Sequence, residues 1–254
     1  MRLPRRLRHG EEATLVEHLD ELRSRIVVSL LALCVAFAVT WAFHGSIIHW
    51  LNKPLPHGYK PTTFSVAEPF MTSFTVSLYA AFVLAMPILF WQVWAFLAPA
   101  LEDNSQKMIS GLVAFAFVMA CVGIAFGYFV VMPPAIHFLT NFDTSIYHVQ
   151  IRAKDYYSFV SLCLLASALV FEVPMFVLGL TRLRILSTAK LRKNRRMGYA
   201  IMAVIAVAMP GVDPITTTLE MIPLMLLFES SIWLSLLFDR RTASRHAAAA
   251  TVPE

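Results

Sequence analysis

The stretch from Met108 to Met132 reads MISGLVAFAFVMACVGIAFGYFVVM and contains no charged residue. An α-helix rises about 1.5 Å per residue, so about 20 apolar residues are enough to cross the ~30 Å hydrocarbon core of a bilayer. This stretch is long enough to cross on its own. It therefore predicts a membrane-spanning helix, which we expect Pro133 and Pro134 to end because neither proline can donate a helical hydrogen bond.

Comparable apolar stretches lie on both sides of it. The chain has 254 residues, of which 58% are hydrophobic and 15% are charged, whereas about 25% of the residues in soluble domains are charged. We therefore expect an all-α polytopic integral membrane protein that forms a single membrane domain over residues 1–254. The six predicted transmembrane helices are residues 26–43, 70–94, 108–132, 156–181, 197–209 and 215–238. Residues 1–25 are expected to be an amphipathic cytoplasmic segment, and residues 239–254 a disordered cytoplasmic tail.

The fifth predicted helix is the shortest, because only 16 uncharged residues lie between Arg196 and Asp213. A helix of that length spans about 24 Å, which is less than the usual hydrocarbon thickness. The turn Pro210–Pro214 then leads into the sixth helix, which Asp213 is expected to cap at its N-terminus. We therefore expect the fifth helix and its turn to thin the bilayer locally.

The Lys and Arg residues predict the orientation of the helices. If the N-terminus is cytoplasmic, 17 of the 21 Lys and Arg residues lie in cytoplasmic segments, and the outer loops hold only Lys53, Lys60, Arg152 and Lys154. Cytoplasmic loops are usually the basic ones, so both termini are predicted to be cytoplasmic. The net charge of +5 lies beside apolar stretches, which indicates contact with lipid and not with nucleic acid. The basic cluster at residues 190–196 is expected to fix topology and to contact anionic lipid.

Two carboxylates lie deep within predicted helices. Glu172 is ten residues from Arg182, and Glu229 is ten residues from Asp239, which places both about 15 Å from a helix end and near the bilayer midplane. A central acidic residue costs roughly 2.5–3.5 kcal/mol on insertion scales, so it should face a hydrated cavity or a partner helix, or be protonated. A carboxylic acid that is hydrogen-bonded only for packing is the alternative, and for Glu229 the two interpretations are equally favoured. Glu220 lies nearer the outer end of its helix, where it reaches water more easily, so Glu229 ranks above it as a functional candidate.

The segment before the first predicted helix carries charged residues at helical spacing. Glu17 and Glu21 are four residues apart and share one face. Arg25 follows Glu21 by one turn, at the spacing of an i,i+4 ion pair. From this pattern alone, a solvated helix face is the favoured interpretation.

The sequence contains no set of residues typical of an intramembrane enzyme. It has neither a His-Glu-x-x-His zinc motif nor paired membrane aspartates, and Cys34, Cys121 and Cys163 lie in three separate apolar stretches. We therefore expect no enzymatic activity, no catalytic or metal-binding residue and no cofactor. An ion-coupled secondary transporter of a small solute is the main alternative function, because midplane carboxylates are common in such proteins. No inverted repeat in the sequence supports that alternative.

Four motifs occur in an order and spacing that fit the predicted helices. They are His18–Arg25 (HLDELRSR), Gln92–Leu101 (QVWAFLAPAL), Tyr128–Val131 (YFVV) and Phe171–Pro174 (FEVP). Together they resemble the receptor subunit of the twin-arginine translocase, the TatC family of Sec-independent protein translocase proteins. The resemblance implies a concave, glove-like helical bundle in the bacterial cytoplasmic membrane. It also implies binding of the Arg-Arg signal peptides of folded precursor proteins, with export driven by the proton motive force.

The resemblance also implies partners and a binding site. The expected partners are twin-arginine signal peptides, TatA- and TatB-like single-helix subunits, membrane lipids and further copies of the chain within a larger complex. By motif match, Glu21 takes the role of the carboxylate that contacts the twin arginines, with Arg23 beside it. This replaces the solvated-face interpretation of Glu21. An arginine requirement follows from chemistry, because a guanidinium forms a planar bidentate pair with a carboxylate and a lysine ammonium does not.

The sequence departs from the family pattern in the first cytoplasmic loop, where the usual acidic residue falls on Ser105. We expect Glu102 or Asp103 to supply this second signal-peptide carboxylate. The resemblance places Glu172 in the concave cavity, where it would meet a polar group of a partner's transmembrane helix. Asp213 corresponds to the family's proline–aspartate turn, and Glu229 is grouped with these two as an intramembrane polar contact.

Overall fold

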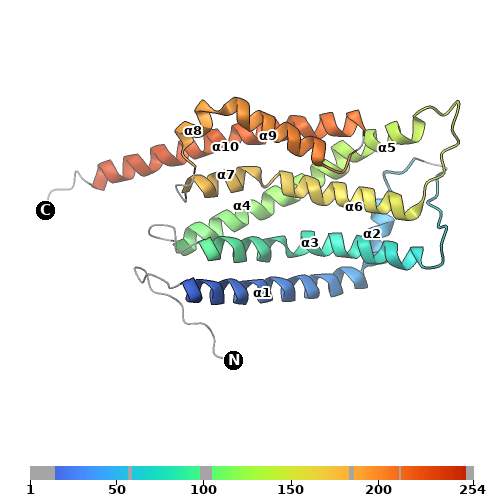
Figure 1. The fold of residues 1–254 in the computed structure, drawn as a ribbon, viewed down its shortest axis with the longest axis horizontal. Helices are drawn as coiled ribbons and strands as arrows, with labels where there is room; N and C mark the ends of the chain where they lie inside the picture. Colours follow the sequence, from blue (N-terminus) through green and yellow to red (C-terminus); the bar gives the residue numbers. More distant parts are fainter. Residues whose placement is uncertain (1–14, 57–58, 98–104, 183–185, 212, 250–254) are drawn as a thin grey trace. The chain divides into compact units, whose positions relative to one another are not determined.

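The structure is a computed structural model that describes residues 15–56, 59–97, 105–182, 186–211 and 213–249. Among these residues the backbone is almost entirely helical, and the only strand-like pairing is a single bridge between Thr62 and Arg152. The prediction of an all-α protein is confirmed (Figure 1). In chain order the helices are α1 (Leu15–Ala42), α2 (His44–Leu51), α3 (Glu68–Leu97), α4 (Ser105–Phe126), the π-helix η2 (Gly127–Val131), α5 (Met132–Asn141), α6 (Ala153–Val170), α7 (Val173–Arg182), α8 (Thr188–Lys193), α9 (Arg195–Ala208) and α10 (Pro214–Ala249).

Five helical segments in the described part of the chain are long and apolar enough to cross a membrane. They are His18–Ala42, Glu68–Phe96, Ser110–Asn141, Ala153–Thr181 and Pro214–Leu237. Each overlaps one of the predicted transmembrane helices. The remaining predicted helix is α9, which has 14 residues and therefore spans only about 21 Å. Its short length agrees with the prediction, and its crossing of the membrane stays a prediction.

The chain divides into two compact units, each built from two stretches of sequence. The first unit comprises Met1–Val118 and Gln150–Leu165, and the second comprises Met119–Val149 and Ala166–Glu254. In the first unit α1 packs along α3 (Figure 1). Small side chains of α1 and α3, namely Ala36, Ala81 and Ala85, are buried where the helices meet, and small residues of this kind let helix backbones approach closely in a membrane.

In the second unit α10 packs against α7 and α9. The buried core includes Met202 of α9 and Leu224, Phe228 and Ile232 of α10. Gly198 of α9 is required by this packing, because a Cβ atom built there would lie 2.1 Å from Cζ of Phe228. The hairpin of α9 and α10 is thus held by an aromatic ring that lies directly on a glycine.

The helix that contains the YFVV motif does not end at Pro133 and Pro134, so that prediction is wrong. The helical backbone continues through η2 and α5 to Asn141. The prolines lie in the first turn of α5, directly after η2, and the first turn is the part of a helical element that tolerates proline best. In the π-helical turn before the prolines, the N–H of Met132 donates to the carbonyl of Gly127, five residues earlier. This wider turn lets the helix continue into the proline pair.

The carboxyl-terminal segment also differs from its prediction. Residues 239–254 were expected to be disordered, but α10 continues to Ala249. The segment is rich in alanine and arginine, both strong helix formers, and it extends a helix that is already nucleated. The rest of the predicted tail, residues 250–254, lies outside the described residues.

Candidate functional site

The first turns of α1 carry the motif HLDELRSR and hold the predicted receptor carboxylate, Glu21. Its side chain is 23% exposed, as is that of Arg25. The Nε of Arg25 donates to Oε1 of Glu21 at 3.0 Å, and the Nη2 of Arg25 donates to the same oxygen. The predicted i,i+4 ion pair is therefore confirmed. Arg23 is exposed and forms no hydrogen bond or ion pair with another described residue.

Arg25 also joins α1 to the QVWAFLAP motif of α3. Its Nη1 lies 3.4 Å from Oε1 of Gln92, and its Nη2 donates to the carbonyl oxygen of Ala95 at 3.0 Å. One turn before Glu21, the ring of His18 stacks on Phe96, with 4.3 Å between the centroids. Glu21 is thus bracketed by two contacts with α3. The predicted topology implies that both motifs lie at the cytoplasmic ends of their helices, but the sequence did not predict which of their residues pair.

Glu102 or Asp103 was predicted to supply the second signal-peptide carboxylate. Glu102 and Asp103 lie outside the described residues, and Ser105 is the first residue of α4. Their role in signal-peptide binding therefore stays a prediction.

Glu172 lies at a break between α6 and α7. Pro174 has no N–H group to donate back to the preceding turn, so the helix is interrupted at Phe171 and Glu172 before it resumes. The Glu172 side chain is completely buried, and neither carboxyl oxygen has a hydrogen-bond partner among the described residues. A buried polar group without a hydrogen-bond partner is rare in native protein structures.

Glu229 and Glu220 of α10 have different surroundings. Glu229 accepts a hydrogen bond from the hydroxyl of Tyr199 and lies 3.5 Å from Nη2 of Arg195, both on α9. Glu229 therefore already has partners within the chain, which favours the packing interpretation. Glu220 is buried, and both of its carboxyl oxygens lack a partner within the described part of the chain. The structure thus reverses the order that the sequence suggested, since Glu220 and not Glu229 is the unsatisfied group.

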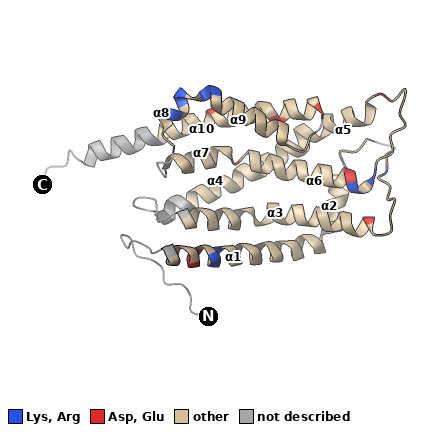
Figure 2. Cartoon of the chain, viewed as in Figure 1, with Lys and Arg blue, Asp and Glu red and all other residues tan. Residues whose placement is uncertain are grey.

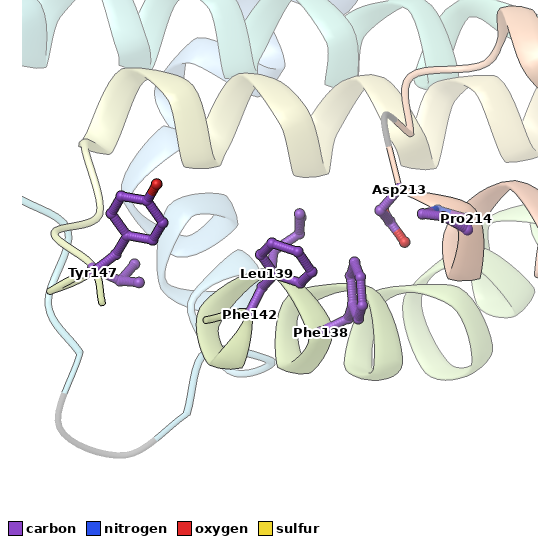
Figure 3. A pocket seen from close by; sticks show the side chains of 7 residues that line it. Phe138, Leu139, Phe142, Tyr147, Asp213 and Pro214 are labelled. Atoms are coloured by element: carbon purple, nitrogen blue, oxygen red, sulfur yellow. The ribbon is translucent and has the colours of Figure 1, made fainter. Parts of the chain in front are cut away.

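Asp213 caps the last helix, as predicted. Its Oδ1 accepts from the backbone N–H of Thr216 at 2.8 Å, and its Oδ2 accepts from the Thr216 hydroxyl. Pro214 is the first residue of α10, the position that suits proline best in a helix. Asp213 also borders an open pocket of about 520 Å³ (Figure 3). The other residues that line it are Phe138, Leu139, Phe142, Tyr147, Val149 and Pro214.

A further buried carboxylate was not predicted from the sequence. Glu68, the first residue of α3, accepts hydrogen bonds from Nε and Nη2 of Arg152 at 3.0 and 3.2 Å. It also accepts from the backbone N–H groups of Phe64 at 3.0 Å and Lys154 at 3.3 Å. The hydrogen bond with Glu68 raises the pKa of Arg152. The available signal was an acidic residue at the very start of an apolar stretch, opposite a basic residue in the next predicted outer loop.

Charged residues lie mainly near the ends of the long helices, and few lie in their middle parts (Figure 2). The largest basic cluster covers α8 and the start of α9. Its exposed members are Lys190, Arg192, Lys193 and Arg196, whereas Arg195 pairs with Glu229. This distribution is typical of a helical membrane protein.

Comparison with known proteins identifies the family. A family model described as "Sec-independent protein translocase protein (TatC)" matches residues 17–223. The chain belongs to the TatC family. Among relatives, the Sec-independent protein translocase protein TatC of Desulforapulum autotrophicum is 32% identical over 247 residues, covering 96% of this chain and 92% of that protein. TatCd of Bacillus subtilis is 33% identical over 241 residues, covering 94% and 99%. TatC of Escherichia coli strain K12 is 32% identical over 225 residues, covering 87% of each.

The fold matches as well. The crystal structure of the twin arginine translocase receptor TatC in DDM has a TM-score of 0.77 and 29% sequence identity, covering 86% of this chain and 99% of that one. A second TatC crystal structure gives a TM-score of 0.75 at 28% identity. This TatC-family chain is therefore a multi-pass inner-membrane component of a protein translocase, and not an enzyme. Family membership assigns it to protein transport and sets aside the alternative of small-solute transport.

Proposed function

We propose that this TatC-family chain is the receptor of its translocase and binds the paired arginines of a signal peptide at the first turns of α1. The observation that supports this most directly is the position of Glu21. It is a partly exposed carboxylate on a helix end that two contacts attach to α3, through His18 with Phe96 and Arg25 with Ala95. A binding group held in place before its ligand arrives loses less freedom on binding.

The chemistry of a carboxylate at this position suits arginine. A guanidinium presents a rigid fork of N–H groups that matches the two carboxylate oxygens, whereas a lysine ammonium is a point charge. Asp20 is exposed beside Glu21 and adds negative potential without requiring contact. The orientation needed for this function is the predicted one, with the start of α1 on the cytoplasmic side, where precursors are made.

The second unit supplies the proposed contact with single-helix partners of the TatA and TatB type. Glu172 and Glu220 are both buried without hydrogen-bond partners among the described residues. Leaving such groups unsatisfied within a membrane is costly. A polar side chain on an incoming transmembrane helix would satisfy either carboxyl group, so we assign these two residues, and not Glu229, to partner assembly.

Export of an Arg-Arg precursor in cells tests the receptor assignment. Glu21→Gln keeps the size and one acceptor of the side chain but removes its charge, and we expect it to abolish export while the protein still inserts into the membrane. Asp20→Asn is the matched comparison, because it removes the adjacent exposed charge from the same helix turn, and it should lower export far less than Glu21→Gln does, since only negative potential and no direct contact is lost. Crosslinking of a photoreactive residue at position 21 to the signal peptide reports contact directly. Normal export by the Glu21→Gln variant would refute the assignment.

A further inference from the structure

Arg25 is hydrogen-bonded to the carboxylate of Glu21, the group to which the signal peptide is proposed to bind. We propose that Arg25 is a resident competitor for Glu21, and that an incoming peptide guanidinium displaces it from Oε1 in order to bind. This inference rests on the proposed function of Glu21. It adds a residue that sets the affinity of the site and that the receptor assignment alone does not require.

The geometry at Glu21 leaves the site half occupied. Both contacts from Arg25, through Nε and Nη2, converge on Oε1. Oε2 of Glu21 forms no hydrogen bond with any described residue. A peptide arginine therefore has one free oxygen for its first contact. The full bidentate fork requires both oxygens, so it forms only when Arg25 releases Oε1.

Arg25 has a second place to bind when it leaves Glu21. Its guanidinium already donates to the carbonyl oxygen of Ala95 at 3.0 Å and lies 3.4 Å from Oε1 of Gln92. Ala95 is in the last turn of α3, where free carbonyl groups and the helix dipole favour a cation. After exchange at Glu21, the Arg25 guanidinium therefore still has hydrogen-bond partners and is not left as an unpaired charge.

The exchange requires little energy because the resident pair is weak. Glu21 and Arg25 are each 23% exposed, and partly solvated i,i+4 pairs contribute little to helix stability. The peptide competes with two arginines against the single resident Arg25, and its apolar segment adds further contacts. Arg25 thus lowers the affinity of the site for any cation without blocking a ligand that forms the complete fork.

Peptide binding to the purified full-length chain in detergent tests this proposal. The probes are two labelled signal peptides of identical sequence except that one contains Arg-Arg and the other Lys-Lys. In Arg25→Gln we expect the dissociation constant of the Arg-Arg peptide to fall by about two- to fivefold. The Lys-Lys peptide should gain less, since a single ammonium cannot use the released oxygen as a fork. Lys193→Gln, which removes an exposed charge on α8, is the control for net charge and should leave both constants unchanged.

Two results would overturn the exchange. Weaker binding of both peptides to Arg25→Gln would show that Arg25 only supports the helix end. An equal gain for both peptides, matched by Lys193→Gln, would show a simple effect of net charge. If Arg25→Gln fails to accumulate, Arg25→Lys serves instead, because it keeps the charge but loses the convergent pair of donors, and the Arg-Arg peptide should still bind more tightly.

Glu21→Gln separates this inference from the function on which it rests. We expect it to weaken binding of the Arg-Arg peptide both alone and combined with Arg25→Gln. If Glu21→Gln weakens binding but Arg25→Gln does not tighten it, the exchange is wrong and the receptor assignment stands. If Glu21→Gln leaves binding unchanged, both are wrong.

Discussion

Arg152 and Glu68 join the segment before α6 to the start of α3, with Nε of Arg152 3.0 Å from Oε1 of Glu68 and Nη2 3.2 Å from Oε2. The Glu68 side chain is 2% exposed and that of Arg152 is 42% exposed. Next to this pair, the backbone N–H of Thr62 donates to the carbonyl of Ile151. The loop before α3 is therefore fastened to the segment before α6 by a carboxylate that accepts from both side chain and backbone.

Glu68→Ala is expected to lower the thermal midpoint of the detergent-solubilised chain more than Arg152→Ala does. Loss of the carboxylate leaves the guanidinium and two backbone N–H groups, those of Phe64 and Lys154, without their acceptor. Loss of Arg152 leaves Glu68 with both backbone donors. Lys154→Ala is the control, because only the backbone of Lys154 contacts Glu68. Equal midpoints for the Glu68 and Lys154 variants would contradict the role of the carboxylate.

Gly198→Ala is expected to destabilise the second unit by about 1–3 kcal/mol, the usual cost of overpacking a core. The added Cβ would lie 2.1 Å from Cζ of Phe228 and 2.4 Å from its Cε1, so the ring must move out of its buried position. Denaturant unfolding in mixed micelles measures the change. Gly111→Ala is the matched control, since nothing lies within 4 Å of a Cβ placed there and alanine favours a helix over glycine. A Gly198 variant as stable as the Gly111 variant would contradict the packing.

Much of this fold was predictable because bilayer thickness determines the length of an apolar stretch. The described backbone contains a helix for every predicted stretch, including the short α9. Helix ends were less predictable. Pro133 and Pro134 fit into the first turn of α5 once the π-helical turn precedes them, and no periodicity in the sequence signals that turn.

Individual site contacts depend on how helices rotate against one another, which a single sequence does not reveal. The pair of Glu21 and Arg25 was predictable because both residues lie on one helix at fixed spacing. The contact of Arg25 with Ala95 was not, because it depends on which face of α1 packs against α3. The same reason explains Glu229, whose partners Arg195 and Tyr199 come from the preceding helix.

Asp213→Ala is expected to destabilise the start of α10 by about 0.5–2 kcal/mol, the typical cost of removing a helix cap. The carboxylate satisfies the backbone N–H of Thr216 at 2.8 Å, one of the donors that a helix N-terminus leaves free. Asp213→Asn should retain most of the stability because an amide oxygen can accept the same hydrogen bond. Amide hydrogen exchange at residues 215–218 locates the effect. Equal exchange in the Ala and Asn variants would show that capping is not the role of this side chain.

Glu172→Met and Glu220→Met are expected to stabilise the isolated chain, by about 1–3 kcal/mol each if the buried carboxyl groups stay unsatisfied. Both side chains are buried without hydrogen-bond partners among the described residues, and methionine has a similar volume without the polar atoms. Thermal unfolding of the purified chain measures this effect. Glu229→Met provides the contrast and should destabilise, because it strands Arg195 and Tyr199.

The same Met variants should lose crosslinks to single-helix partners in native membranes. A residue whose role is packing stabilises the isolated subunit. A residue whose role is assembly lowers the stability of the isolated subunit and gains its hydrogen bonds only when a partner binds. Greater stability of the isolated chain together with weaker assembly would therefore identify Glu172 and Glu220 as partner contacts. Lower stability on replacement by methionine would mean that each carboxyl group is satisfied within the chain, and the proposed contact would then lose its physical basis.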